Sequence, residues 1–299
     1  MTSRIIEIAA RDPRQSPLTR NRTGKILDAI TPTDDPFDLA TRVITHEGRI
    51  TGHTSDAYWA FVGPFGGTTA ATMLRAMMDH PEREGDPLAL TVNYCAPIAK
   101  GPFDLNVRLI KPNRSSQHWS VELTQGEDVA AFATAVFAIR RPSWSYQPKT
   151  MPQVIAFEDA KPYDKAAANW VRQYQFRFVD RGPQIGDGND KMLASAHTKL
   201  WIRGAVPRKL DAVSLAAMGD AFFGRIFHVR KEIVPFGTVS MTTYFHADAE
   251  DLAAANTDTV LGVADASVFH KSYGDQIAEL WSPDGKLLAT TQQVTYFKA

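Results

Sequence analysis

The sequence predicts an α+β protein in which antiparallel strands enclose a buried helix, and in which this arrangement occurs twice. The first observation is the stretch 210–227, where Leu215, Met218 and Phe222 recur at helical spacing and alanines fill the other sides. A helix that is apolar nearly all round is a buried helix. The second observation is an order of strands, one long helix and four strands that repeats at a period of about 150 residues. A long antiparallel sheet can bury one helix on its concave face, which explains why both helices lack a charged side.

Composition limits the classes of function. The chain has 299 residues, of which 44% are hydrophobic and 22% charged, as in a globular protein with a sizeable core. Lys plus Arg and Asp plus Glu are both 33, so no net field attracts nucleic acid or an anionic membrane, and we expect neither as a partner. The single cysteine, Cys95, excludes an internal disulfide and a thiolate-rich metal site.

The sequence shows neither the apolar run of a membrane span nor the features of a signal peptide. No apolar run approaches the roughly 18 residues of a membrane span. Arg4, Glu7 and Arg11 interrupt the apolar positions of the N-terminus, unlike a signal peptide. We therefore expect a cytoplasmic protein.

The first half of the repeat is expected over residues 37–140, after an N-terminal extension, 1–36, that ends in a Pro- and Asp-rich segment. Residues 41–50 are strand-like, and a Gly- and Pro-rich segment at 63–67 precedes a helix over 67–78. Four β-rich runs follow, at 88–95, 103–110, 117–123 and 129–139. Residues 141–169 are rich in Pro, Lys and Asp and are typical of a linker.

The second half, 170–299, repeats the order. Strands are expected at 173–179 and 199–204, and the buried helix at 211–227 comes next. Four further strands are expected at 237–246, 257–269, 276–281 and 287–298.

Asp220 is the residue of this helix that needs an explanation. A carboxylate among Met, Ala and Phe costs several kcal/mol unless it is paired or used in chemistry. One interpretation is that Gly219 and Asp220 mark a helix break and that Asp220 caps a second short helix, because Gly in a helix interior costs on the order of 1 kcal/mol. The other is a catalytic carboxylate on an enclosed helix. Asp211, in contrast, stands at the start, where it can cap free amides.

Taken together, these blocks resemble the double hot-dog acyl-CoA thioesterases of the medium-chain thioesterase II family. The resemblance covers about residues 40–140 and 170–299. It rests on Phe65-Gly66-Gly67, Tyr94-Cys95-Ala96-Pro97, Gly219-Asp220, the run 237–246 and the run 288–293. It implies a double hot-dog fold, two antiparallel sheets each wrapped around a long central helix, and a hydrolase of fatty acid metabolism with acyl-CoA as its substrate and no cofactor.

The family's active site is an Asp, a Ser or Thr and a Gln, all in the second half, holding the water that attacks the thioester. By resemblance these are Asp220, Thr238 and Gln293. A shift of one residue would select Gln292 instead, and since neighbouring strand residues face opposite sides, only one of the two can face the helix. The residue types suit the chemistry: a partly desolvated carboxylate has raised basicity, while Thr and Gln orient a water without titrating.

Four further residues are candidates for substrate binding. Gly66 and Gly67 would let substrate approach the first helix, whose N-terminal amides can stabilise an oxyanion, although a plain turn explains them equally well. Phe222 and Phe223 are candidates for lining an acyl tunnel, although an apolar helix face is more often plain core. Acyl chain length, the residues that bind the CoA phosphates and homo-oligomerisation are left open.

Other functions should have left a trace. No Gly-x-Ser-x-Gly, nucleotide-binding glycine motif or His-Glu-x-x-His occurs, so a serine hydrolase, a nucleotide enzyme and a metal site are disfavoured. An enoyl-CoA hydratase-like enzyme on the same fold would need an Asp/His pair near a helix start, and neither 63–71 nor 210–215 contains His. A non-catalytic acyl-binding protein of the same fold stays as the main alternative.

Overall fold

The computed structural model describes residues 35–165, 168–180, 182–186 and 192–298. The extension expected over residues 1–36 therefore lies almost entirely outside the described residues. Its last two positions are Asp35, the N-cap of α1 (Pro36–Ala40), and Pro36, the first residue of that helix; the Asp35 side chain accepts hydrogen bonds from the amides of Phe37 and Asp38. This helix begins where the predicted Pro-rich segment ends.

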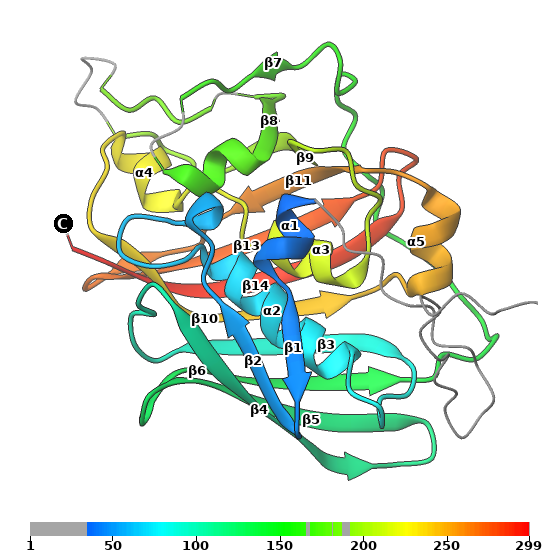
Figure 1. The fold of residues 1–299 in the computed structure, drawn as a ribbon. Coiled ribbons are helices and arrows are strands. Elements are labelled where there is room, and N and C mark those ends of the chain that lie inside the picture. Colours follow the sequence, from blue (N-terminus) through cyan, green and yellow to red (C-terminus); the bar gives the residue numbers. More distant parts are fainter. Residues whose placement is uncertain (1–34, 166–167, 181, 187–191, 299) are drawn as a thin grey trace, which may run out of the picture. The chain divides into compact units, whose positions relative to one another are not determined.

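All described strands belong to one antiparallel sheet of 14 strands. The first series comprises β1 (Val43–His46), β2 (Arg49–His53), β3 (Asp86–Tyr94), β4 (Pro102–Pro112), β5 (Ser116–Gln125) and β6 (Asp128–Ala138). The second comprises β7 (Lys161–Pro162), β8 (Tyr174–Phe178), β9 (Thr198–Gly204), β10 (Phe236–Phe245), β11 (Thr259–Asp265), β12 (Phe269–His270), β13 (Tyr273–Trp281) and β14 (Leu287–Phe297). The structure thus differs from the expected two sheets, because β3 and β10 pair with each other and join both series (Figure 1).

The strand order is nearly symmetric about that junction. Outward from β3 lie β6, β5, β4, β2 and β1, and outward from β10 lie β14, β13, β11, β9 and β8. The register is interrupted at matching places, between Pro87 and Ala89 where β3 pairs with β6, and between Thr238 and Ser240 where β10 pairs with β14. Residues of the two series can therefore be matched position by position.

Two helices lie over the same face of this sheet (Figure 1). The first, α2 (Gly66–Met78), is 13 residues long and confirms the helix predicted over 67–78. The second, predicted as one helix over 211–227, is broken into α3 (Ala212–Met218) and α4 (Arg225–Arg230). Gly219 ends α3 and costs less there than in a helix interior, and its carbonyl accepts a hydrogen bond from the Thr291 hydroxyl at 3.1 Å.

Smaller differences follow from turn chemistry. The strand predicted over 41–50 is a hairpin, β1 and β2, that turns at Glu47 and Gly48, both with positive φ. The linker predicted over 141–169 contributes β7, which pairs with β8, and is followed by a 3-10 helix (Asn169–Gln173). A further helix, α5 (Ala249–Ala255), was not expected.

The core fills the space between the sheet and these helices. Met73 and Leu74 of α2 and Leu215 of α3 are fully buried and belong to one hydrophobic cluster with inward residues of both strand series. In the part of the chain that the structure describes, no helix is both long and apolar enough to cross a membrane. The boundaries 37–140 and 170–299 stay a prediction, and these two ranges are called the first and second half below.

Candidate active site

Asp220 lies in the turn that follows α3 and not within a helix. Its backbone amide donates to the carbonyl of Ala217 at 3.1 Å, and its own carbonyl accepts from the amide of Phe222 at 2.8 Å. The side chain is 8% exposed. Asp220 does not cap α4, whose N-cap is Gly224 without a side-chain hydrogen bond. The helix break expected by one interpretation is therefore present, but the capping role that came with it is not.

Gln293 of β14 is the hydrogen-bond partner of this carboxylate. The strand alternates strictly here, so that Gln293 is 2% exposed and faces the helices while Gln292 is exposed on the other face. The Gln293 Nε2 atom donates to Asp220 Oδ1 at 2.9 Å. The structure thus brings Gln293, and not Gln292, to Asp220.

Thr238 reaches the same place because of the bulge in β10. Simple alternation would put Thr238 and Met241, three residues apart, on opposite faces. The extra residue of the bulge, Val239, restores a common face, where Thr238 pairs with Thr295 and Met241 with Gln293. The Thr238 hydroxyl donates to Gln293 Oε1 at 3.3 Å.

The N-terminus of α2 faces Asp220 from the first half. A Cβ on Gly66 would lie 2.8 Å from Asp220 Oδ2, and a Cβ on Gly67 would lie 2.5 Å from the carbonyl oxygen of Ala217 in α3. Both contacts are closer than a side chain tolerates, so the two glycines let α2 approach the turn of Asp220. The Tyr94 hydroxyl donates to the Gly66 carbonyl at 2.8 Å and fixes this approach.

Burial dominates the electrostatics of Asp220. It raises the pKa of the carboxyl from 3.8 to about 7, against the smaller opposite effects of the Gln293 side chain and the Gly67 amide. The same burial, with the nearby charge of Asp220, raises the pKa of Tyr94 well above its ordinary value, so this hydroxyl stays protonated. The site therefore holds one carboxyl that titrates near neutral pH beside neutral hydrogen-bonding groups.

The two phenylalanines of the prediction belong to the segment between α3 and α4, and each packs against other elements. The Phe222 ring is buried over Gly262 of β11, within 2.7 Å of where a Cβ would stand. Phe223 is half-buried in an aromatic cluster, with ring centroids 4.8–6.3 Å away. Its partners there are Tyr163, Trp170, Phe176 and Phe178.

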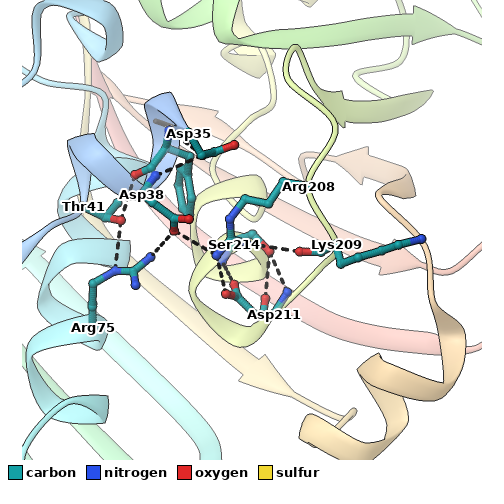
Figure 2. Close-up of polar contacts among 9 residues, drawn as sticks. Asp35, Asp38, Thr41, Arg75, Arg208, Lys209, Asp211 and Ser214 are labelled. Atoms are coloured by element: carbon teal, nitrogen blue, oxygen red, sulfur yellow. Dashed lines mark hydrogen bonds and ion pairs between the residues drawn. The ribbon is translucent and has the colours of Figure 1, made fainter. Parts of the chain in front are cut away.

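The N-terminus of α3 is closed by side chains. Asp211 caps it as predicted, accepting from the Ser214 amide at 2.7 Å. Figure 2 shows Arg208 bridging Asp211 and Asp38, at 2.6 and 3.0 Å, with Arg75 of α2 on the other side of Asp38 at 2.8 Å. This network joins α1, α2 and α3.

Sequence reasoning missed two polar residues that face the helices near this site. One is Tyr94, described above. The other is Gln276 of β13, whose place is opposite Gln293 in the strand pairing. The inward alternation Gly274, Gln276, Ala278 was the signal that would have found it. Among the described residues, no group of three or more His, Cys, Asp or Glu side chains is arranged to hold a metal ion.

Two family models match the chain. The model of the acyl-CoA thioesterase N-terminal domain matches residues 55–138, and that of the acyl-CoA thioesterase C-terminal domain matches residues 148–297. A search of curated proteins finds no match.

Solved structures agree with this assignment. A conserved protein of unknown function with a hot-dog fold from Alicyclobacillus acidocaldarius is 43% identical, with 88% of this chain and 98% of that chain covered and a TM-score of 0.83. A putative thioesterase II from Thermobifida fusca is 15% identical, with 88% and 97% covered and a TM-score of 0.74. An acyl-CoA thioesterase II from Mycobacterium marinum is 17% identical, with 88% and 98% covered and a TM-score of 0.69.

The last two structures, at this low identity, show the fold alone. The two family models, matched in order along the chain, and the 43% identical hot-dog protein go further. The chain belongs to the acyl-CoA thioesterase family and has its hot-dog fold.

Proposed function

We propose that the protein is an acyl-CoA thioesterase that hydrolyses an acyl-CoA to a free acid and CoA by attack of a water molecule. The observation that carries this proposal is the buried carboxyl of Asp220, which is hydrogen-bonded to Gln293 and has its pKa raised to about 7 by burial. A general base works best when its pKa lies near the working pH.

In the proposed reaction Asp220 accepts a proton from water as the water oxygen bonds to the thioester carbon. The carbon–sulfur bond of the resulting tetrahedral intermediate then breaks, and the protonated Asp220 gives its proton to the CoA thiolate. The oxyanion needs hydrogen-bond donors at the position where its charge develops. We propose backbone amides at the N-terminus of α2 as these donors, because the absence of a side chain at Gly66 lets this helix start lie close to Asp220 Oδ2.

Gln293 and Thr238 act on the water mainly through Asp220. Both ends of the Gln293 amide are engaged, its oxygen by the Thr238 hydroxyl and its nitrogen by Asp220. This chain of hydrogen bonds holds Asp220 Oδ1, so we propose that Oδ2, on the side of Gly66, is the atom that takes the proton. The Thr238 oxygen keeps a lone pair with which it can orient the water.

The proposed acyl position lies along the turn 219–224. Phe223, half-buried beside the turn, and Phe222, enclosed over β11, are the side chains we propose to bound the acyl group. Gly66 and Gly67 bound it on the side of α2.

The test is an assay of thiol release from acyl-CoAs of increasing chain length, with the wild-type protein and with Asp220→Asn. We expect turnover to fall by at least about 10², because the variant loses the proton acceptor and keeps the size of the side chain. Stability should hold or rise, since a buried ionisable group becomes a neutral amide. A destabilised variant that keeps its activity would show that Asp220 is structural.

The same assay separates the alternatives. A non-catalytic acyl-binding protein would bind acyl-CoAs without releasing thiol. A hydratase-like enzyme would add water to an enoyl-CoA and leave the thioester intact.

A further inference from the structure

Gln276 has a buried side-chain amide whose oxygen makes no hydrogen bond within the described part of the chain. It lies on the inward face of β13, is 3% exposed, and its Oε1 atom has no hydrogen-bond partner among the described residues. Burying an amide that makes no hydrogen bond costs free energy, and natural proteins pair almost all such groups. An unpaired one in a family of enzymes needs an explanation.

Its position connects it to the proposed active site. Gln276 stands directly opposite Gln293 in the pairing of β13 with β14. Side chains so paired have their Cβ atoms about 5 Å apart and lie side by side. Gln293 donates to Asp220, so the unpaired Oε1 of Gln276 lies one side chain away from the proposed catalytic hydrogen bond.

The matching position in the first half shows what an ordinary core residue looks like here. Ala135 of β6 matches Gln293, because they pair with Leu90 and Met241 at the same distance from the two bulges. The residue opposite Ala135 on β5 is Trp119, which is 1% exposed, contacts the Phe137 ring and donates its indole N–H to Gln117. Trp119 satisfies its polar atom within the core, whereas Gln276 leaves its Oε1 unpaired among the described residues.

The neighbours of Gln276 along its own strand are small, although the residue itself is enclosed. On the same face of β13, the residues two positions away are Gly274 and Ala278. Neither has a side chain that can cover or pair the amide. Gln293, the other polar neighbour, uses its oxygen for Thr238 and its nitrogen for Asp220.

We propose that the amide of Gln276 binds an oxygen substituent on the acyl group, so that the preferred substrate is an acyl-CoA with a hydroxyl or keto oxygen close to the thioester. This inference rests on the proposed thioesterase function. A plain hydrocarbon chain would leave the amide unpaired, whereas a hydroxyl or keto oxygen pairs with it. Rotation of the amide presents either its oxygen or its NH2 group, so it can bind a donor or an acceptor.

The experiment compares kcat/KM for butyryl-CoA, 3-hydroxybutyryl-CoA and acetoacetyl-CoA. We expect the wild-type protein to prefer the two oxygenated substrates by about tenfold, the order of one additional hydrogen bond. Gln276→Met has a similar length and no amide, and it should lose this preference mainly through KM while the pH profile keeps its midpoint. Gln292→Met, the same change on the exposed face of β14, is the matched control and should keep the preference.

Two outcomes would overturn the inference: equal kcat/KM for all three substrates, or a preference that survives in Gln276→Met. The latter would mean that the amide has a structural role alone. If Gln276→Met does not fold, Gln276→Asn, which keeps the amide but withdraws it by one methylene, should weaken the same preference. Calorimetric binding of the three acyl-CoAs to Asp220→Asn tests the preference even if the wild-type protein hydrolyses none of them, which would be a failure of the proposed function alone.

Discussion

In the first half, Pro87 lies beside the bulge of β3 and pairs with Phe137 of β6. In the second half, Thr238 lies beside the bulge of β10 and pairs with Thr295 of β14. The next inward pair repeats the contrast, with Ala135 in the first half where the second has Gln293. The backbone is the same in both places, including its irregularity. The comparison teaches that the two halves offer equivalent backbone positions, and that a few inward side chains distinguish the apolar core of the first half from the polar candidate site of the second.

The two helix starts differ in the same sense. The N-terminus of α3 is capped by Asp211, which accepts from the Ser214 amide and is itself paired with Arg208. The N-terminus of α2 begins with two glycines after Phe65, which makes no side-chain capping bond, and it faces Asp220. Tyr94, near this open end, is matched in the second half by Phe245, which has no hydroxyl. Of the two starts, α2 is the one without a side-chain cap, and its Gly67 amide acts on the carboxyl of Asp220.

The largest expected effect that tests this comparison is that of Gln293→Ala. It removes the donor to Asp220 and makes the position like Ala135, and turnover should fall by a factor on the order of 10². Gln292→Ala, on the opposite face, should be nearly neutral. Steady-state assays of both variants, with melting curves as a check of folding, decide the matter, and the reverse ranking would place the functional glutamine on the other face of β14.

The next effect is the dependence on pH. Because Asp220 has its pKa raised to about 7, turnover should fall about tenfold for each pH unit below that value, as the base becomes protonated. A rate profile from pH 5 to 9 measures it. A flat profile over this range would remove Asp220 from the proton transfer.

The same pKa predicts the sign of a stability change. The folded protein binds the Asp220 proton more tightly than the unfolded chain does, so this contribution to stability is present below about pH 4 and is lost as pH rises to about 7. Asp220→Asn does not titrate. Its melting temperature relative to wild type should therefore increase between pH 4 and pH 8, and an unchanged difference would contradict the burial of the charge.

A smaller effect is expected for Thr238→Val, which keeps the shape and removes the hydroxyl. The bond from Thr238 to Gln293 is neutral and 3.3 Å long, so its loss should lower turnover by about fivefold to tenfold. Thr295→Val, on the same face beside it, is the control and should affect turnover less, because its hydroxyl is paired with the Gly274 carbonyl. Equal losses in the two variants would indicate general damage to the strand.

The smallest expected effect on turnover is that of Asp211→Ala. It removes the cap of α3 and one partner of Arg208, which should cost about 1–2 kcal/mol of stability. Chemical denaturation measures this cost, and an assay below the melting temperature should show nearly normal turnover. A large loss of turnover would mean that the start of α3 is also a site.

Much of this organisation was predictable, and the failures have local causes. Periodicity located α2, most strands and the repeat, because burial on one face leaves a clear pattern. The periodicity predicted a continuous helix through Gly219 and Asp220, which was wrong. A turn enclosed by the core has the same apolar composition as a buried helix, so the pattern does not separate the two. The periodicity also did not predict that β3 and β10 pair with each other, because the alternation within a strand does not depend on which strand it pairs with.

The resemblance named Asp220, Thr238 and Gln293, and their catalytic roles stay a prediction; what brings these side chains together could not be derived from the sequence. The placement of Thr238 depends on the bulge at Val239, which strict alternation cannot indicate. Gln276 escaped notice because a glutamine in a strand carries no motif, and its significance comes from the residue opposite to it. The contact of Gly66 with Asp220 joins positions 154 apart in the chain, and only the packing of α2 on the turn of Asp220 brings them together.

The pairing of β3 with β10 has a consequence for how such a protein can diverge. In a symmetric dimer of identical chains, every substitution appears at both equivalent places, so a tryptophan that closes one site closes the other. Here the equivalent places belong to one chain and are encoded separately, so a substitution changes only one of them. The core residue Trp119 and the polar Gln276 can therefore stand at equivalent places, because each half can be substituted without changing the other.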